Sequence, residues 1–494
     1  MNGAVRWDVD RPDLSWTIDL MHNPKPYPPL MHDFRQFIAE GTSRAFLQMG
    51  IPTRVAYQGV NGYAYGARER LQAVPAERSV ADRSASLWQD WQNQYLPEIQ
   101  AIYAAWDVFA ITQADQPALR AHLEWVADRS VRLWEIHFVA VEPAFHSLET
   151  FFDFYRREIP GSSDLDAAAL LQGYPNVLTG VDERLWALAV GDPARPDHHA
   201  AVTEFLRVYG ALGDEQGEFF SHSWAEDPAQ LAKEVARHAG LPDPRTRRRD
   251  LAAARETRQA AVRARLSAPT RERFDVLHAQ ARVGNVLSED HHFYIDRQWL
   301  WRIKRLCAGC GLWLAARGQV DDPGDVAFLT LDELRAGISD AVDVSGRAPE
   351  RRTRFAQQRD LSPPRALGKP AGEEKADRFR GAPVPQGMSR TINGLAASPG
   401  LARGRAVVMT SMADLDGLEQ GDVLVCGTTN ASLVPFFERI GALVTDTGGV
   451  LSHAAVVARE FGLPAVVGTE VATQRIRTGQ RVEVDGSTGE VRLL

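Results

Sequence analysis

The spacing of apolar residues changes abruptly along this chain, and the change limits the folds open to it. Between residues 80 and 340 apolar side chains recur at three- and four-residue spacing, as in SASLWQDWQNQYLPEIQAIYAAW, which predicts helices. From residue 394 onward, short valine-rich runs such as DVLVC, ALVTD and RVEVDG alternate with short helical patterns. The chain is therefore expected to be multidomain, with a mostly α-helical body followed by a compact α/β domain.

The segment between these two parts is rich in proline, glycine and charge and nearly free of aliphatic periodicity. This composition is typical of an exposed linker with semi-rigid proline segments, although a packed surface arm can share it. We expect three parts: a helical domain of one or two subdomains over residues 1–343, a linker over 344–390 and the α/β domain over 391–494.

Composition narrows the functional classes. A net charge of −8 argues against a nucleic-acid partner, because phosphate binding needs a positive surface. No stretch approaches the roughly 18 consecutive apolar residues of a membrane-spanning helix, and the N-terminus lacks a signal-peptide pattern. Three cysteines do not make a disulfide framework. A cytoplasmic protein without a membrane partner is expected.

Two local patterns favour structural interpretations. Cys307 and Cys310 have the spacing of redox and zinc sites, but no second Cys or His pair stands at finger spacing. Because the two cysteines lie in an apolar helical run, core packing is favoured and no metal site is expected. The arginine-rich run over residues 245–266 favours a solvent-exposed helix face over a phosphate-binding patch.

The strongest chemical signal is TDTGGVLSHAAVVAREFGLPAVVG, residues 445–468. Gly448 and Gly449 allow a turn of positive φ that presents backbone amides, and Ser452 is a good helix N-cap. His453 would then be the first helical residue, where amides and the helix dipole attract a phosphate-sized anion. Because imidazole can carry a phosphoryl group covalently, His453 is the candidate catalytic nucleophile and Thr447, Gly448, Gly449 and Ser452 are the candidate phosphate-binding residues, although an ordinary polar residue at a helix start fits the same local pattern.

This segment resembles the phosphohistidine motif of the phosphoenolpyruvate-utilising enzyme family. The matching positions are Thr445, Thr447, Gly448, Gly449, Ser452, His453, Ala458, Arg459, Gly462, Pro464, Ala465 and Gly468. The resemblance extends over residues ~390–494, although the family usually has an aromatic residue near Leu433 and this chain has none. It implies a swivelling domain in which His453 is phosphorylated.

Looser resemblances cover the body. LLQGYPNVLTG, FFSHSWAEDP and GQVDDPGDVAFLTLDELRAG look like parts of the substrate domain of rifamycin-type and phenol-type phosphotransferases. The ATP-grasp domain that charges the histidine in this family is not recognisable here. The resemblance therefore implies a separate ATP-grasp subunit that binds ATP and Mg²⁺, as in phenylphosphate and alkylphenol phosphate synthases. The acceptor would be a phenol, a cresol or another aromatic alcohol.

Acceptor-binding residues are expected in SEDHHFYIDRQWLWRIK, which combines acids, histidines and cations. Phosphoryl transfer needs a base for the acceptor proton and positive charge for the phosphoryl oxygens. We predict His292 as that base and Asp290, His291, Arg297 and Lys304 as substrate-binding residues. In a regular helix His292 and Lys304 would lie near the same side. Asp19 and His22 are a second candidate pair.

Two alternatives remain open. An antibiotic phosphotransferase of the rifamycin type would act on a large hydroxylated macrocycle and would need an open cleft, whereas a phenol needs a small closed one. A non-enzymatic phosphocarrier or regulatory protein would keep the phosphoryl group on His453 without a small-molecule acceptor.

Overall fold

The computed structural model describes residues 5–20, 22–23, 25–191, 195–214, 218–370 and 390–494. The chain divides into two compact units, so the expected multidomain organisation is confirmed. Unit 1 comprises Met1–Pro143, Gln216–Phe220 and Tyr294–Glu373, and unit 2 comprises Ala144–Glu215, Ser221–Phe293 and Glu374–Leu494. The second half of the helical body therefore clusters with the C-terminal sheet domain rather than with the N-terminal helices.

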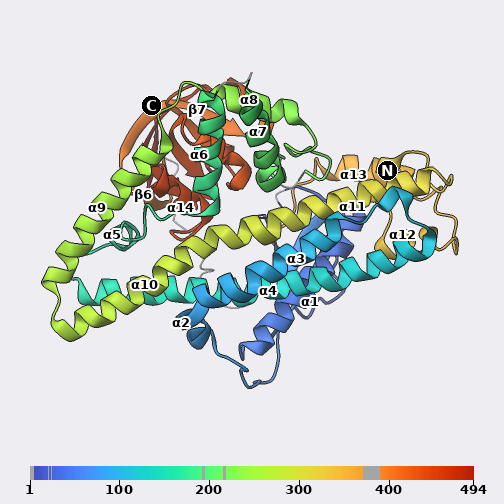
Figure 1. Ribbon diagram of the computed structural model, residues 1–494, viewed down its shortest axis with the longest axis horizontal. Coiled ribbons are helices and arrows are strands. Elements are labelled where there is room, and N and C mark those ends of the chain that lie inside the picture. Colours follow the sequence, from blue (N-terminus) through green and yellow to red (C-terminus); the bar gives the residue numbers. More distant parts are fainter. Residues whose placement is uncertain (1–4, 21, 24, 192–194, 215–217, 371–389) are drawn as a thin grey trace. The chain divides into compact units, whose positions relative to one another are not determined.

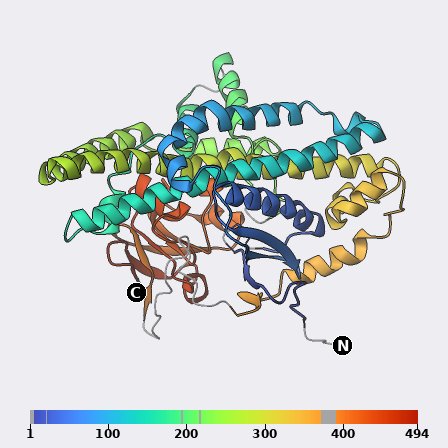
Figure 2. The same cartoon turned by 90° about the horizontal axis from the view of Figure 1, so that it is seen from below.

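Unit 1 combines helices with a small antiparallel sheet of order β2-β3-β1-β4. Helix α1 begins at Pro29, as expected after a proline-rich segment, and packs against β2 (Figure 2). The elements are β1 (Ser15–Ile18), α1 (Pro29–Gln48), β2 (Thr53–Val60), β3 (Tyr63–Arg70), α2 (Val80–Asp90), the π-helical η1 (Trp91–Tyr95), α3 (Leu96–Asp107), η2 (Ile111–Gln113), the first part of α4 (Gln116–Glu158), most of the π-helical η3 (His292–Arg297), α11 (Gln298–Ala315), η4 (Pro323–Phe328), α12 (Leu331–Ile338), α13 (Ala348–Gln358) and β4 (Ala366–Gly368).

The prediction of an exposed linker over residues 344–390 is wrong for the first part of that segment. Residues 348–358 form α13, whose Phe355 is buried with Ala348 and Phe328, and residues 366–368 pair with β1. A single buried aromatic on an otherwise charged helix gives little apolar periodicity, which is why the pattern reads as a linker. The remainder of that segment, residues 371–389, lies outside the described residues.

Unit 2 joins a helical part to the C-terminal sheet. Helices α9 and α10 follow one another through a short turn and form the green-to-yellow hairpin of Figure 1. The helical elements are the second part of α4, α5 (Asp164–Ala168), α6 (Val177–Val190), α7 (Pro196–Tyr209), α8 (Pro228–His238), α9 (Pro244–Arg265) and α10 (Ala268–His291), which continues into η3. His198 and His199 lie in the first turn of α7.

The C-terminal part of unit 2 is a mixed eight-stranded sheet of order β5-β12-β11-β7-β8-β9-β10-β6, in which β7 to β10 run parallel. Its core is aliphatic, and its predicted strands are confirmed. ASLVPF is 3₁₀-helical and contains Pro435. The elements are β5 (Thr391–Asn393), β6 (Leu395–Ser398), β7 (Leu401–Met409), η5 (Met412–Gly417), β8 (Asp422–Cys426), η6 (Ala431–Phe436), β9 (Ile440–Thr445), α14 (His453–Glu460), β10 (Ala465–Val467), α15 (Ala472–Arg475), β11 (Arg481–Asp485) and β12 (Glu490–Leu493).

A search of the described residues for long apolar helices finds none able to span a bilayer.

Helix α10 approaches the second part of α4 closely at Gly284. A Cβ atom at this position would lie 2.4 Å from both the Ala144 carbonyl oxygen and Ser147 Oγ. Any side chain here must therefore push the two helices apart.

We expect Gly284→Ala to lower the free energy of unfolding by about 1–3 kcal/mol, because the added methyl overpacks the α4–α10 contact. Urea denaturation measures this loss. Gly240→Ala is the matched control, since a Cβ there meets nothing within 4 Å, and its effect should stay within about 0.5 kcal/mol. Equal stabilities for the two variants would contradict the packing argument.

Candidate active site

His453 is the first residue of α14, as the sequence predicts. Ser452 caps the helix by accepting a hydrogen bond from the Ala455 N–H. The imidazole Nδ1 lies 2.6 Å from Glu289 Oε2, and Glu289 belongs to the last turn of α10. The other ring nitrogen, Nε2, is buried and makes no well-formed hydrogen bond among the described residues, although the Asn430 backbone lies near enough to the ring to help raise the pKa of His453.

The Glu289 carboxylate sets the electrostatics of the imidazole. The Glu289 side chain is 2% exposed and that of His453 is 18% exposed. Burial by itself lowers the pKa of His453, but the charge of Glu289 and its hydrogen bond outweigh burial, so the pKa is raised above the ordinary value. In the neutral ring, an Nδ1–H donated to Glu289 leaves the lone pair on Nε2. The arrangement therefore orients one defined tautomer.

Glu289 is one of the acids in the segment that the sequence singles out for acceptor binding, but it is not among the predicted site residues. It stands in the SEDHH segment, beside the predicted residues, but the contact with His453 spans 164 residues. No local spacing distinguishes it from its acidic neighbour Asp290. Only the position of α14 against α10 identifies it.

The predicted phosphate-binding turn has the expected backbone geometry. Gly448 has φ +115°, and a Cβ there would meet Ser452 Oγ at 2.8 Å, so the turn requires glycine. The carbonyl of Gly449 accepts a hydrogen bond from the Ser452 N–H, and the Thr447 hydroxyl donates to the Gly427 carbonyl. The Thr447 hydroxyl thus holds the turn and the Ser452 hydroxyl caps the helix. Phosphate binding by these residues stays a prediction.

Three of the predicted acceptor residues lie beside Glu289 in unit 2. The His292 ring centroid is 6.2 Å from that of His453. Asp290 Oδ1 accepts a hydrogen bond from the Val177 N–H at the start of α6, and His291 Nδ1 lies 2.6 Å from the Leu287 carbonyl oxygen. The structure therefore brings His292 near the nucleophile, while Asp290 and His291 contact backbone groups.

The other two, Arg297 and Lys304, belong to unit 1 and not to the unit of His453. The expectation that His292 and Lys304 share a helix side assumed a regular α-helix. Residues His292–Arg297 are instead π-helical. Hydrogen bonds from i to i+5 place more residues in each turn, so every side chain after this turn is rotated from its α-helical direction.

The second candidate pair, Asp19 and His22, does form. His22 Nδ1 lies 3.0 Å from Asp19 Oδ1, and Arg35 and Asn23 donate to Asp19 Oδ2 at 2.9 and 2.7 Å. Burial would raise the pKa of Asp19, but the charges and hydrogen bonds of His22 and Arg35 lower it below the ordinary value. A carboxylate anchored in this way fixes the His22 ring.

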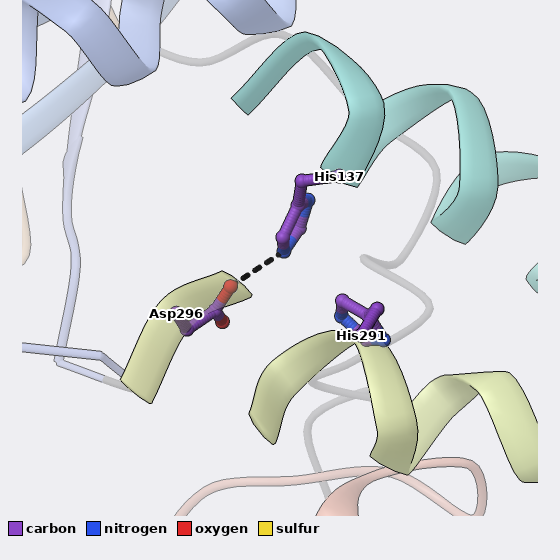
Figure 3. A group of neighbouring side chains, drawn as sticks. All are labelled: His137, His291 and Asp296. Carbon is purple, nitrogen blue, oxygen red and sulfur yellow. Dashed lines mark ion pairs between the residues drawn. The ribbon is translucent and has the colours of Figure 1, made fainter. Parts of the chain in front are cut away.

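Unit 1 holds another histidine–carboxylate pair, which sequence reasoning missed. His137 Nε2 on α4 lies 3.1 Å from Asp296 Oδ1 in the π-helical turn (Figure 3). The His137 side chain is 9% exposed and that of Asp296 is 14% exposed. The two residues are far apart in sequence, and only the altered phase of the π turn directs Asp296 toward α4. Figure 3 also draws His291, which belongs to unit 2.

The three thiols are free and buried. Burial raises the pKa of Cys310 to about 12 and that of Cys307 well above its ordinary value, so neither is a reactive thiolate near neutral pH. These properties support the packing interpretation of the CxxC spacing.

The arginine-rich helix α9 differs from the expected solvent-exposed face. Arg247 forms ion pairs with Asp182 of α6 and Glu438 of the sheet domain and stacks on the Phe461 ring at 4.1 Å. Arg255 donates to the Gln172 carbonyl at 2.8 Å. Part of this face therefore docks the sheet domain onto the helical part of unit 2.

Family models match both partners of the Glu289–His453 pair. Residues 418–489 match the mobile domain of PEP-utilising enzymes, which includes His453. Residues 190–289 match the fourth domain of rifampicin phosphotransferase, and this match ends at Glu289. The pair thus joins the two matched segments.

Curated relatives extend these matches. A stretch of chondramide synthase cmdD of Chondromyces crocatus is 32% identical over 97% of this chain and makes up 14% of that protein. The uncharacterised phosphotransferase YvkC of Bacillus subtilis is 36% identical over 42% of this chain and 25% of its own length. The rifampicin phosphotransferase of Streptomyces sviceus is 40% identical over 37% of this chain and 20% of its own length. The chain spans a quarter or less of each of these relatives.

The Glu460 carboxylate, at the other end of α14, predicts a pH dependence of stability. Burial raises its pKa to about 7, although the Gly173 N–H and nearby arginines oppose the shift. Between pH 4.5 and 7 the folded state then binds a proton that the unfolded state releases, so ionisation of Glu460 reduces stability as pH rises.

We therefore expect Glu460→Gln to flatten the loss of unfolding free energy between pH 5 and pH 8. Over this range, the wild type should lose on the order of 3 kcal/mol more unfolding free energy than Glu460→Gln. Urea titrations at four pH values measure it. Glu419→Gln, at an exposed glutamate of the same domain, is the control. A Glu460→Gln slope as steep as that of the wild type would contradict the assignment.

Proposed function

The chain belongs to the phosphoenolpyruvate-utilising enzyme family, and from this premise we propose that it is a phosphotransferase that carries a phosphoryl group on His453. Its mobile-domain match and its relatives among phosphotransferases support this activity. The acceptor in this proposal is the hydroxyl of a phenol, a cresol or another aromatic alcohol.

The Glu289–His453 contact is the observation that carries the proposal. With Nδ1–H held by Glu289, the lone pair of the neutral ring lies on Nε2. Nε2 is then the atom that bonds phosphorus. When the N–P bond breaks, the proton retained on Nδ1 lets the ring leave as neutral imidazole rather than as an anion.

The surroundings of His453 suit a bound phosphoryl group. The residue begins an eight-residue helix, so the positive end of the helix dipole faces its side-chain site. The turn at Gly448 and Gly449 brings further backbone close to the same helix start. We infer that Thr447, Gly448, Gly449 and Ser452 bind the phosphoryl oxygens, with the amides of Gly448 and Gly449 as the backbone donors, because the N–H groups of Thr447 and Ser452 already donate to the carbonyls of Gly427 and Gly449.

Transfer to the acceptor needs a base, and we assign this role to His292. The acceptor O–H bond breaks as the O–P bond forms and the N–P bond to His453 breaks, and the released proton passes to the imidazole of His292. The 6.2 Å between the two ring centroids places the imidazole of His292 beside that of His453. Asp290, His291, Arg297 and Lys304 remain our candidates for acceptor binding.

The phosphoryl donor in this proposal is a separate ATP-grasp subunit that binds ATP and Mg²⁺. It would transfer the β-phosphoryl group of ATP to His453 and release AMP and phosphate. The sheet domain would then swivel between donor and acceptor, a hinge-type domain motion. The ion pairs of Arg247 and the Glu289–His453 contact would hold it in the acceptor-facing position.

A larger acceptor is the second candidate, because unit 1 contains an open cleft of about 490 Å³. Its lining includes Trp16, Tyr27, His32 and Tyr57. This volume exceeds what a phenol fills and lies in the range of drug-sized ligands. An acceptor screen with phenol, p-cresol, benzyl alcohol and rifampicin separates the two candidates.

The first test follows the phosphoryl group. With a lone ATP-grasp protein, Mg²⁺ and [β-³²P]ATP, we expect acid-labile label on the wild-type chain and none on His453→Ala. Glu289→Gln should accept label at the wild-type rate but transfer it to the acceptor at least about tenfold more slowly, because the tautomer is no longer fixed in the acceptor-facing position.

Product formation by His453→Ala would refute the phosphohistidine mechanism. Label that stays on His453 with every acceptor of the screen would instead favour the phosphocarrier alternative.

The second test concerns the base. We expect His292→Asn to accept label on His453 at the wild-type rate but to transfer it to acceptor about 10²–10⁴-fold more slowly, the usual contribution of a general base. Chase of labelled protein with the best acceptor measures the transfer. A normal chase rate in His292→Asn would exclude His292 and return attention to His22.

A further inference from the structure

Helix α14 carries a second functional side chain on the same face as His453. Glu460 follows His453 by seven residues, and 3.6 residues per turn bring position seven back to nearly the same direction. The helix ends at Glu460, so the two side chains mark its two ends. At about 1.5 Å per residue, they are separated by roughly 10 Å of rigid helix.

One short segment, residues 170–177, supplies hydrogen bonds to the Glu460 end of α14, beside the Arg247 contact with the Phe461 ring. The Gly173 N–H donates to both carboxylate oxygens of Glu460, at 3.1 and 3.0 Å. Gln172 Nε2 donates to the carbonyl of Arg459 at 3.0 Å. These two contacts are called the clamp below. Glu460 is 7% exposed, so its carboxylate depends on protein donors.

The clamp segment is itself fixed to the helix that carries Glu289. Asn285 and His278 of α10 bond the carbonyls of Leu171 and Leu170 at 3.2 and 2.9 Å. At its other end, the Val177 N–H donates to Asp290, the residue after Glu289. Helix α10 therefore holds α14 at two points, directly through Glu289 and indirectly through residues 170–177.

Arg255 of α9 also contacts residues 172–174. It donates to the Gln172 carbonyl at 2.8 Å and stacks over the Tyr174 ring at 3.8 Å. A Cβ on Gly173 would lie 2.8 Å from the Ala252 backbone nitrogen, so the segment also lies tightly against α9. Helices α9 and α10 thus hold the backbone of residues 170–177 through contacts that do not involve the sheet domain.

We propose that Glu460 and Gln172 are positioning residues that hold α14 on α10, so that His453 Nδ1 stays in contact with Glu289. This inference rests on the proposed function. Neither residue touches the reacting atoms. Their role is to set the position of the far end of the helix, because a rigid two-turn rod released at Glu460 tilts at His453. The tilt lengthens the hydrogen bond to Glu289 and frees the imidazole to change tautomer.

The test reads the His453 ring rather than turnover. In the full chain with ¹³C-labelled histidine, and with the His453 signal assigned by its loss in His453→Asn, we expect a pKa raised by Glu289 in the wild type. Glu460→Ala should lower it by about one unit and Gln172→Ala by about half a unit, because the Glu289 contact is looser. Glu460→Gln keeps a hydrogen-bond acceptor and should restore part of the shift.

Glu419→Gln, at an exposed glutamate of the same domain, is the matched control and should titrate as the wild type. Melting temperatures separate the positioning effect from general loss of structure. If Glu460→Ala does not fold, Gln172→Ala decides, since it leaves the Glu460–Gly173 contact in place. Wild-type titration of His453 in folded clamp variants would overturn the proposal.

The proposed function fails by a different result. If an ATP-grasp partner and [β-³²P]ATP leave wild-type His453 unlabelled, the phosphotransferase is refuted while the titration still reports on the clamp. Where transfer does occur, we expect Glu460→Ala to lower kcat about tenfold with the acceptor KM unchanged, because the acceptor contacts are intact.

Discussion

The buried contact between Glu289 and His453 is the constraint on which the arrangement of unit 2 depends. A carboxylate that is 2% exposed needs a charged or hydrogen-bonding partner, because an unpaired buried charge costs several kcal/mol. The imidazole is the partner that the structure provides. The pair also ties the helical part of the unit to the sheet domain, together with the contacts of Arg247 and of residues 172–173. Whatever changes the charge on the imidazole changes the stability of that docking.

Much of the helical part serves to hold α10 in place. Gly284 allows α10 to approach α4 closely, and the carboxylate of Asp290 receives the first N–H of α6. Asn285 and His278 bond the segment that reaches Glu460. Over about four turns, α10 thus contacts α4, the start of α6 and the segment of residues 170–171. These contacts leave Glu289, on the same helix, little freedom to move. Precise placement matters because phosphoryl transfer depends on positioning more than on covalent assistance.

The parts of this site that the sequence predicts are those with local signals. Gly448, Gly449, Ser452 and His453 follow one another, and each acts through its immediate neighbours as a turn, a cap or a helix start. Glu289 has no such signal, because its role comes from a residue 164 positions away. The docking arginines of α9 look like any solvated helix face until the sheet domain lies against them. The π turn at His292–Arg297 leaves no mark in the apolar spacing, although it redirects Asp296 and Arg297.

The histidine–carboxylate pairs differ in ways that bear on their chemistry. The His453–Glu289 and His137–Asp296 pairs are largely buried, whereas the His22 side chain is 58% exposed and its partner Asp19 is held by Arg35 and Asn23. A phosphoryl carrier gains from burial, because water would hydrolyse the N–P bond, and a base that receives an acceptor proton gains from access. By this criterion His22 is better suited to proton transfer than His137, and His137 is better suited to fixing the π turn through Asp296. The same two residue types therefore serve different purposes according to exposure.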